Sequence, residues 1–211
     1  VLASRRQAVE RRLVADVPVG CLLSGGVDSS LIEGLLAEAG QTGLNTFSIG
    51  FDTVGDEKGD EFQYSDLIAE KFGTRHHKLR VDGQRTLSTL EKCVRRMSEP
   101  MVSHDVIAFY LLSQEVAKHV KVVQSGQGAD EIFGGYHWYP PMMESADPVA
   151  DYAKVFRDRD FGEFQRAVHP DLVDADHSLA FIRDHFAAPG ADSGIDKALR
   201  IDTRVMLIDD P

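Results

Sequence analysis

Val19-Gly20-Cys21-Leu22-Leu23-Ser24-Gly25-Gly26-Val27-Asp28-Ser29-Ser30 is the stretch on which the fold of this 211-residue chain depends. The apolar run from Gly20 to Leu23 is typical of a parallel strand that is covered on both faces. Apolar residues at helical spacing follow the turn, at Leu31, Ile32, Leu35 and Leu36. The stretch therefore predicts a buried strand, a glycine turn and a helix, in that order.

The turn between this strand and this helix has the composition of a phosphate site. It combines two glycines with three serines, namely Gly25, Gly26, Ser24, Ser29 and Ser30. Glycines lack the Cβ atom that keeps a backbone away from a ligand, and unpaired N–H groups at a helix N-terminus attract anions. Asp28 would repel phosphates unless a divalent cation lay between them, so we predict that Asp28 is a magnesium ligand. A plain turn with a capping serine is the alternative.

A second glycine turn follows the strand predicted at residues 120–124. It reads Ser125-Gly126-Gln127-Gly128-Ala129-Asp130-Glu131 and again contains acids. In a parallel sheet a ligand binds in the crevice outside the carboxyl ends of the strands. We therefore predict that Asp28 and Asp130 face one crevice and together bind magnesium beside a phosphate chain.

The rest of the chain alternates helical and extended patterns, which predicts an α/β fold with a parallel sheet. Helices are expected at residues 2–15, 29–39, 62–72, 86–97 and 106–119, and strands at 45–51 and 76–81. His76 and His77 are expected on opposite faces of their strand, in structural or phosphate-contacting roles. From residue 147 the pattern is helical, and a last helix is expected at 197–208.

Two further segments allow alternative interpretations. The acidic, glycine-rich run at residues 52–60 is expected to be a solvated loop rather than a metal site. The aromatic run at residues 134–141 either covers a small-molecule pocket or packs against a neighbouring domain. The domains expected are a core at residues 1–138 and a mainly helical part of the same region at 139–211, truncated at its C-terminus.

Composition restricts the class of protein. The formal net charge is -11 and basic clusters are small, which argues against a nucleic-acid surface. There is no apolar run of membrane-spanning length and no secretory leader at the start. The two cysteines, Cys21 and Cys93, form no CxxC pair, so the cytoplasm is the expected compartment. The abrupt ends predict a domain taken from a longer protein.

The first turn resembles the Ser-Gly-Gly-x-Asp-Ser loop of the N-type ATP pyrophosphatases, which cleave ATP between its α and β phosphates. Asp16-Val17-Pro18 precedes the first strand, and Phe133-Gly134-Gly135-Tyr136 follows the second turn. With these flanks, most of residues 10–138 resembles the C-terminal synthetase domain of class B, glutamine-hydrolysing asparagine synthetases.

This resemblance implies a PP-loop fold of the adenine nucleotide alpha-hydrolase type, which binds ATP and Mg²⁺. It implies that Asp28 and Asp130 bind the metal and that the backbone at Leu23 and Ile49 holds adenine. The residues implied to line the phosphates and the ribose are Ser24, Gly26, Ser29, Ser125 and Gly126.

Three features depart from that family. The N-terminal glutaminase domain is absent from these 211 residues and is expected in the same full-length chain. The catalytic lysine of the family is expected beyond residue 211, so Lys197 is not assigned that role. Gln127 replaces the usual Glu next to the acyl-adenylate, which makes Gln127 a candidate catalytic residue together with Asp28 and Asp130. This replacement also resembles the N-acetylglutaminylglutamine amidotransferase branch, which amidates a dipeptide terminus.

The expected function is that of an ATP-dependent amidotransferase. A carboxylate substrate, aspartate or an acetylated dipeptide, is adenylated with release of pyrophosphate, and glutamine-derived ammonia then forms the amide. The partners expected are this substrate and the glutaminase domain, without nucleic acid or a membrane, and a homodimer is a candidate assembly. The alternatives are a non-catalytic nucleotide-binding module of the same fold and another PP-loop ligase.

Overall fold

The computed structural model describes residues 1–52, 61–97 and 105–209, with side chains described up to residue 207. Apart from Asp52, the acidic run at residues 52–60 lies outside the described residues. The chain forms two compact units, Val1–Gln127 and Gly128–Pro211, and each is described by itself. The division falls within the second glycine turn. The domain boundary expected at residue 138 stays a prediction.

The first unit alternates helices with strands. Its elements are α1 (Leu2–Arg11), β1 (Val19–Leu22), α2 (Val27–Glu38), β2 (Asn45–Phe51), α3 (Phe62–Phe72), β3 (Arg75–Val81), α4 (Gly83–Val94), α5 (Asp105–Val116) and β4 (Val122–Gln124). Helix α1 ends before the expected residue 15, because the N–H of Leu13 bonds to the carbonyl of Glu10 in a tighter turn. The predicted order of helices and strands is otherwise present.

The four strands form one parallel sheet in the order β3-β2-β1-β4. Leu22 pairs with Phe47, and Cys21 pairs with Gln124, so β1 lies between β2 and β4. Because β1 and β4 pair in parallel, the chain leaves both strands at the same edge of the sheet. The predicted α/β fold with a parallel sheet is confirmed.

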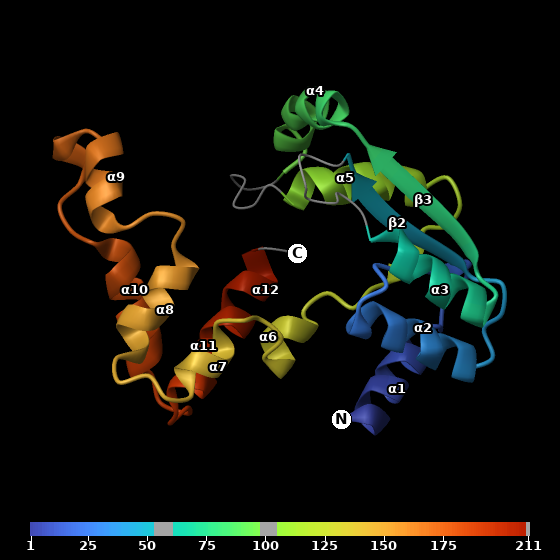
Figure 1. Ribbon diagram of the computed structural model, residues 1–211, viewed down its shortest axis with the longest axis horizontal. Coiled ribbons are helices and arrows are strands. Elements are labelled where there is room, and N and C mark those ends of the chain that lie inside the picture. The colour runs from blue at the N-terminus through green and yellow to red at the C-terminus, as the bar shows by residue number, and fades with distance from the viewer. Residues whose placement is uncertain (53–60, 98–104, 210–211) are drawn as a thin grey trace. The chain divides into compact units, whose positions relative to one another are not determined.

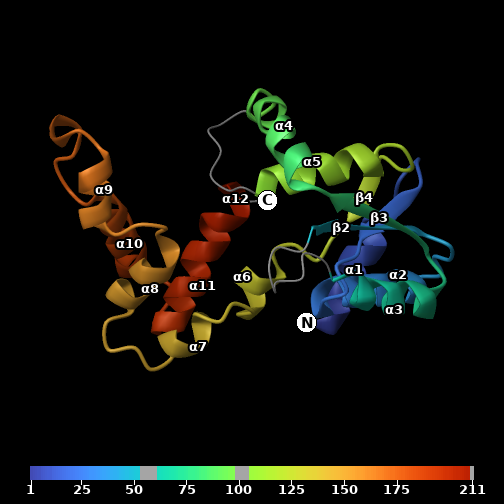
Figure 2. The same ribbon diagram turned by 45° about the horizontal axis from the view of Figure 1, so that its top comes forward.

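Helices cover both faces of this sheet, with α2 and α3 on one side and α4 and α5 on the other (Figures 1 and 2). On the first face, Val9 of α1 and Leu36 of α2 pack around Cys21. On the second face, Leu112 of α5 packs against Phe47. Burial on both faces explains why β1 reads as an uninterrupted apolar run.

His76 and His77 lie on opposite faces of β3, as predicted. Nδ1 of His76 is 2.9 Å from the Thr46 hydroxyl, and its Nε2 is 3.1 Å from the Ser65 hydroxyl on α3. Nε2 of His77 is 2.9 Å from Oδ1 of Asn45. Burial is the main cause that lowers the pKa of both imidazoles. Both histidines therefore make structural contacts between neighbouring elements.

Glu33 on α2 is a buried acid, with 1% of its surface exposed. Its Oε2 has no hydrogen-bond partner among the residues that the structure describes. Burial raises the pKa of the Glu33 carboxyl, and a hydrogen bond from the Cys21 thiol opposes this shift in part. Burial also raises the pKa of the Cys21 thiol, which favours its protonated, donating form. A charged carboxylate at this position lowers the stability of the fold.

Replacing Glu33 by Gln is expected to stabilise the protein more at about pH 8 than at about pH 5. The folded-state pKa of Glu33 lies above its unfolded value near 4.5. The wild type therefore loses stability as the pH rises above that value through the folded-state pKa, whereas an amide does not ionise. Thermal unfolding of both proteins measures the difference, with the exposed Glu70→Gln as the control. A difference that does not change with pH would contradict the ionisation of Glu33.

The second unit is helical. Its elements are α6 (Ala129–Phe133), α7 (Tyr139–Met142), α8 (Pro148–Phe156), α9 (Phe161–Ala167), a 3-10 helix (Pro170–Leu172), α10 (His177–Ala187), α11 (Gly194–Arg204) and α12 (Met206–Asp209). Helix α11 starts before the expected residue 197, because the Ser193 hydroxyl caps it by accepting from the N–H of Asp196. The chain is helical after residue 147, as predicted.

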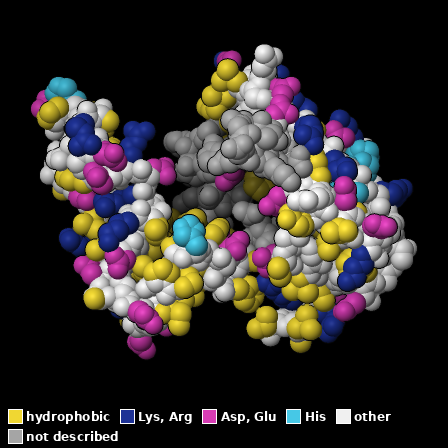
Figure 3. All heavy atoms as spheres, viewed as in Figure 1, with side chains coloured by type: hydrophobic (Ala, Val, Ile, Leu, Met, Phe, Trp, Pro, Cys, Tyr) yellow, Lys and Arg dark blue, Asp and Glu magenta, His cyan; other side chains and the backbone are white. Residues whose placement is uncertain are grey.

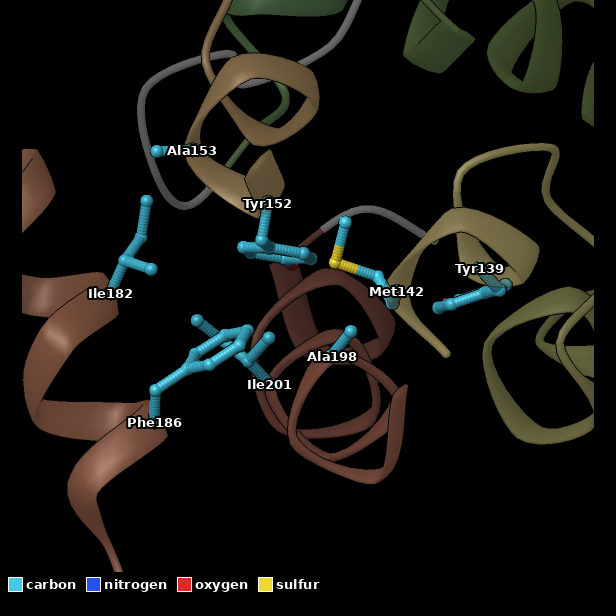
Figure 4. Close-up of a cluster of buried hydrophobic side chains, with 8 residues drawn as sticks. All are labelled: Tyr139, Met142, Tyr152, Ala153, Ile182, Phe186, Ala198 and Ile201. Carbon is cyan, nitrogen blue, oxygen red and sulfur yellow. The ribbon is translucent and has the colours of Figure 1, made fainter. Parts of the chain in front are cut away.

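Four of these helices share one apolar core (Figure 4). Its side chains come from α7, α8, α10 and α11: Tyr139, Met142, Tyr152, Ala153, Ile182, Phe186, Ala198 and Ile201. Tyr136 and Trp138 pack against this core, and Tyr139 is completely buried in it. The aromatic run at residues 134–141 therefore contributes to the core of its own unit, and both roles expected for it stay predictions.

Charges are mixed on the molecular surface. Figure 3 shows Lys and Arg side chains among Asp and Glu side chains on the face that it presents. In the described part of the chain, every helix is too short or too polar to cross a membrane.

Candidate functional site

The first glycine turn leaves the sheet at the end of β1. Leu23 is 1% exposed, and its N–H donates to the carbonyl of Phe47 at 2.8 Å, so β2 holds the start of the turn. Gly25 has a φ of 90°, which favours glycine. Gly26 is the N-cap of α2. The predicted sequence of strand, glycine turn and helix is thus present.

Gly25 also meets a neighbouring helix closely. A Cβ atom at this position would lie 2.5 Å from the backbone nitrogen of Ser65 and 2.6 Å from the carbonyl carbon of Tyr64, both in α3. These are backbone atoms, which cannot move aside as a flexible side chain can. The first turn therefore needs glycine here for a tertiary reason as well as a conformational one.

The Ser29 hydroxyl lies under the turn and bonds to it. Ser29 is 7% exposed, and its Oγ accepts from the N–H groups of Ser24 at 3.2 Å and Gly25 at 3.3 Å. The Ser24 hydroxyl in turn accepts from the N–H of Gly26 at 3.2 Å. Oγ of Ser30 is buried without a partner among the described residues. Ser24 and Ser29, two of the serines predicted as phosphate donors, thus also shape the turn itself.

Asp28 lies in the first turn of α2, and 38% of its side chain is exposed. Nη1 of Arg5, from α1, is 3.6 Å from Oδ1 of Asp28. No functional role was predicted for Arg5 from the sequence. A signal was present, because Arg5 is four residues before the apolar Val9 and so shares its helix face.

The second glycine turn begins directly against the first. A Cβ atom on Gly126 would lie 2.9 Å from Cβ of Asp28 and 2.9 Å from the backbone nitrogen of Ser29. Ser125 and Gln127, on either side of Gly126, are exposed. Within the first unit, the start of the second turn therefore meets the predicted phosphate loop at the carboxyl edge of the sheet.

Ile49, the other residue that the resemblance links to adenine, lies near the end of β2. Its side chain packs against buried residues of α5 on the second face of the sheet. Its side chain therefore belongs to the core, and only its backbone is a candidate contact for adenine.

Asp130 belongs to the second unit, in the short helix α6. Gly128, before this helix, has a φ of 85°. A Cβ atom on Gly135 would lie 1.8 Å from Oδ1 of Asp130. The Asp130 carboxylate therefore occupies space that is open only because Gly135 has no side chain. Glu131 is buried, and its Oε1 accepts from the Tyr136 hydroxyl at 2.8 Å. Because Asp28 and Asp130 belong to different units, their shared crevice stays a prediction.

The two predicted metal ligands, Asp28 and Asp130, each offer only carboxylate oxygens. Such a set fits Mg²⁺, which proteins commonly bind through one or two carboxylates plus substrate phosphates. No cluster of three or more His, Cys, Asp or Glu side chains in the described ranges could hold a metal by itself. The residues present therefore fit a magnesium ion that arrives with a nucleotide better than a fully protein-enclosed metal centre.

The sequence is similar to those of known proteins. The family model "Asparagine synthase" matches residues 3–210. A putative asparagine synthetase [glutamine-hydrolyzing] from Mycobacterium tuberculosis is 37% identical over 139 residues, which are 66% of this chain and 21% of the relative. Asparagine synthetase [glutamine-hydrolyzing] 1 from Bacillus subtilis is 36% identical over 132 residues, 63% of this chain and 20% of the relative.

Among solved structures, an NH3-dependent NAD synthetase from Campylobacter jejuni matches with a TM-score of 0.43 and 13% identity, covering 85% of this chain and 90% of that one. The chain spans about a fifth of the length of the two sequence relatives. These comparisons do not support the narrower N-acetylglutaminylglutamine amidotransferase branch. The family model covers nearly all of the sequence. The chain belongs to the asparagine synthase family.

Proposed function

We propose that this chain is the synthetase part of an ATP-dependent, amide-forming enzyme. It adenylates a small carboxylate substrate with loss of pyrophosphate, and ammonia then displaces AMP to give the amide. The observation that carries this proposal is the contact of Gly126 with Asp28 and Ser29, because it brings two glycine turns together at the carboxyl edge of a parallel sheet. Membership in the asparagine synthase family, whose members use ATP, supports it.

The first turn is the proposed contact surface for ATP. The backbone at Leu23 and Ile49 would hold the adenine. The phosphates and the ribose would contact residues of the two turns: Ser24, Gly25, Gly26, Ser29, Ser30, Ser125 and Gly126. The start of α2 adds backbone N–H groups, whose partial positive charge favours the phosphates.

Asp28 and Asp130 are the proposed magnesium ligands. When bound, the ion would neutralise charge on the phosphates and help pyrophosphate to leave. Asp28 would offer a partly exposed carboxylate from α2. The carboxylate of Asp130 would be oriented by the space beside Gly135, which has no side chain to fill it. Their joint action requires both units in the full-length protein.

Gln127 is the proposed contact for the carboxylate acceptor, and aspartate is the first candidate for that acceptor. An exposed amide next to Gly126 can donate and accept hydrogen bonds without repelling an anionic substrate. Ammonia would come from a glutaminase domain elsewhere in the same protein. The longer relatives, described as glutamine-hydrolysing, support this arrangement.

Mass spectrometry of products tests the function. Full-length protein with ATP, Mg²⁺, glutamine and aspartate is expected to form asparagine, AMP and pyrophosphate in equal amounts. A panel of other small carboxylates, tested in parallel, identifies the acceptor if aspartate is not used. Formation of ADP and phosphate would contradict adenylation. Tight ATP binding without any pyrophosphate release would favour the non-catalytic module instead.

A further inference from the structure

Arg5 is held against the first glycine turn by the packing of α1. One helical turn after Arg5, Val9 is 2% exposed and packs with Cys21, Leu35 and Leu36 beside the sheet. This anchor fixes the face of α1 that carries Arg5. The Arg5 side chain is only 20% exposed, although it stands near the start of a surface helix. The structure thus places a largely covered guanidinium beside the proposed phosphate site.

Several backbone N–H groups of the first glycine turn already donate hydrogen bonds within the turn. The N–H groups of Ser24 and Gly25 donate to the Ser29 hydroxyl, and that of Gly26 donates to the Ser24 hydroxyl. A triphosphate would bring three or four negative charges next to the carboxylate of Asp28, in a protein of net charge -11. The remaining helix N–H groups carry only partial charge. A full positive charge at this place would offset much of the repulsion.

The ion pair between Arg5 and Asp28 is longer than an optimal one. Its N–O distance of 3.6 Å exceeds the roughly 2.7–2.9 Å of a charge-assisted hydrogen bond. The neighbouring Arg6, on the same helix, makes a shorter contact of 2.8 Å with Glu38. The Arg5 guanidinium therefore lies near Asp28 without a close hydrogen bond between the two atoms of this pair.

We propose, on the basis of the function proposed above, that Arg5 is a phosphate-binding residue of the nucleotide site. In the nucleotide-free protein, the guanidinium lies beside the turn, 3.6 Å from the Asp28 carboxylate. When the nucleotide binds, the guanidinium contacts phosphate oxygens, for which its planar set of donors is suited. Asp28 then becomes available to the cation that accompanies the nucleotide. Arg5 and Asp28 would thus form a pair that separates on binding.

Calorimetric titration of the full-length protein tests this role by binding rather than by activity. Arg5→Gln is expected to raise the Kd for Mg-ATP about tenfold and to leave the Kd for adenosine unchanged, because adenosine has no phosphate. Arg5→Lys should show a smaller increase, since it keeps the charge but not the planar donors. Arg6→Gln is the matched control, because it removes an ion pair from the same helix away from Asp28 and should change neither Kd.

The outcomes separate the possible failures. Wild-type protein that does not bind Mg-ATP would overturn the proposed function together with this role of Arg5. If the wild type binds Mg-ATP and Arg5→Gln binds it with an equal or lower Kd, only the role of Arg5 would be overturned. Equal weakening of ATP and adenosine binding would show that the ion pair is merely structural. Melting temperatures of Arg5→Gln and Arg6→Gln check that both variants are folded.

Discussion

Replacing Asp130 by Asn in the full-length protein is expected to lower pyrophosphate formation at least about a hundredfold, while glutamine hydrolysis stays detectable. The amide has the size of the carboxylate, so the place left by Gly135 still accommodates it. It carries no negative charge, however, and binds Mg²⁺ more weakly than a carboxylate. Release of pyrophosphate and conversion of glutamine to glutamate, measured on the same preparation, give the two rates. The corresponding change Asp28→Asn should have the same effect.

The control for this experiment is Asp151→Asn, which removes a partly exposed carboxylate from α8 that bonds to Lys154 at 2.7 Å. It should leave both rates close to those of the wild type. If Asp130→Asn reduced both rates equally, the separation of ATP chemistry from glutamine hydrolysis would be wrong. If it retained pyrophosphate formation, Asp130 would not be a magnesium ligand.

Replacing Asp202 by Leu is expected to destabilise the second unit by about 2–6 kcal/mol. Asp202 on α11 is completely buried and accepts hydrogen bonds from Tyr139 at 2.5 Å and from Tyr152. The two phenols are also buried, so the loss of their acceptor leaves two hydroxyls unpaired, at roughly 1–3 kcal/mol each. Chemical denaturation followed by far-ultraviolet circular dichroism measures the loss. The exposed Asp184→Asn should change stability little.

Apolar replacement of the whole cluster tests the cause of that loss. In a protein that already carries Tyr139→Phe and Tyr152→Phe, Asp202→Leu should cost much less, because no hydroxyl is left without an acceptor. An equal cost in both backgrounds would mean that lost packing, and not unpaired hydroxyls, explains the effect. Burial raises the pKa of the Asp202 carboxyl, whereas the two tyrosine hydroxyls lower it, so the hydrogen bonds only partly offset the cost of burying this acid.

The elements of the fold could be predicted because their signals are local. The apolar run of β1, the period of the helices and the glycines of the two turns each act within a few residues. Parallel strands then place both turns at one edge of the sheet by geometry alone. The contact of Gly126 with Asp28 follows from this geometry, whereas the crevice shared by Asp28 and Asp130 stays a prediction.

The roles of single side chains in the turns were harder to predict. All three serines of the first turn were interpreted as phosphate donors, but the Ser29 hydroxyl is buried and bonds to N–H groups of the turn. Which way a hydroxyl points depends on the exact path of the chain, which composition does not specify. Gly25 is likewise required by the backbone of α3, and this helix is about forty residues later in the sequence.

The sequence by itself determined the α/β class, the strand-turn-helix stretch, the second glycine turn and the family, because these depend on residue types and short spacings. Only the tertiary structure decided that Arg5 reaches Asp28, that Glu33 is buried beside Cys21, and that Asp202 accepts hydrogen bonds from two tyrosine hydroxyls. These contacts join residues that are 12 to 63 positions apart. Such pairs form only when whole helices dock, and docking is governed by the summed packing of many residues rather than by any local pattern.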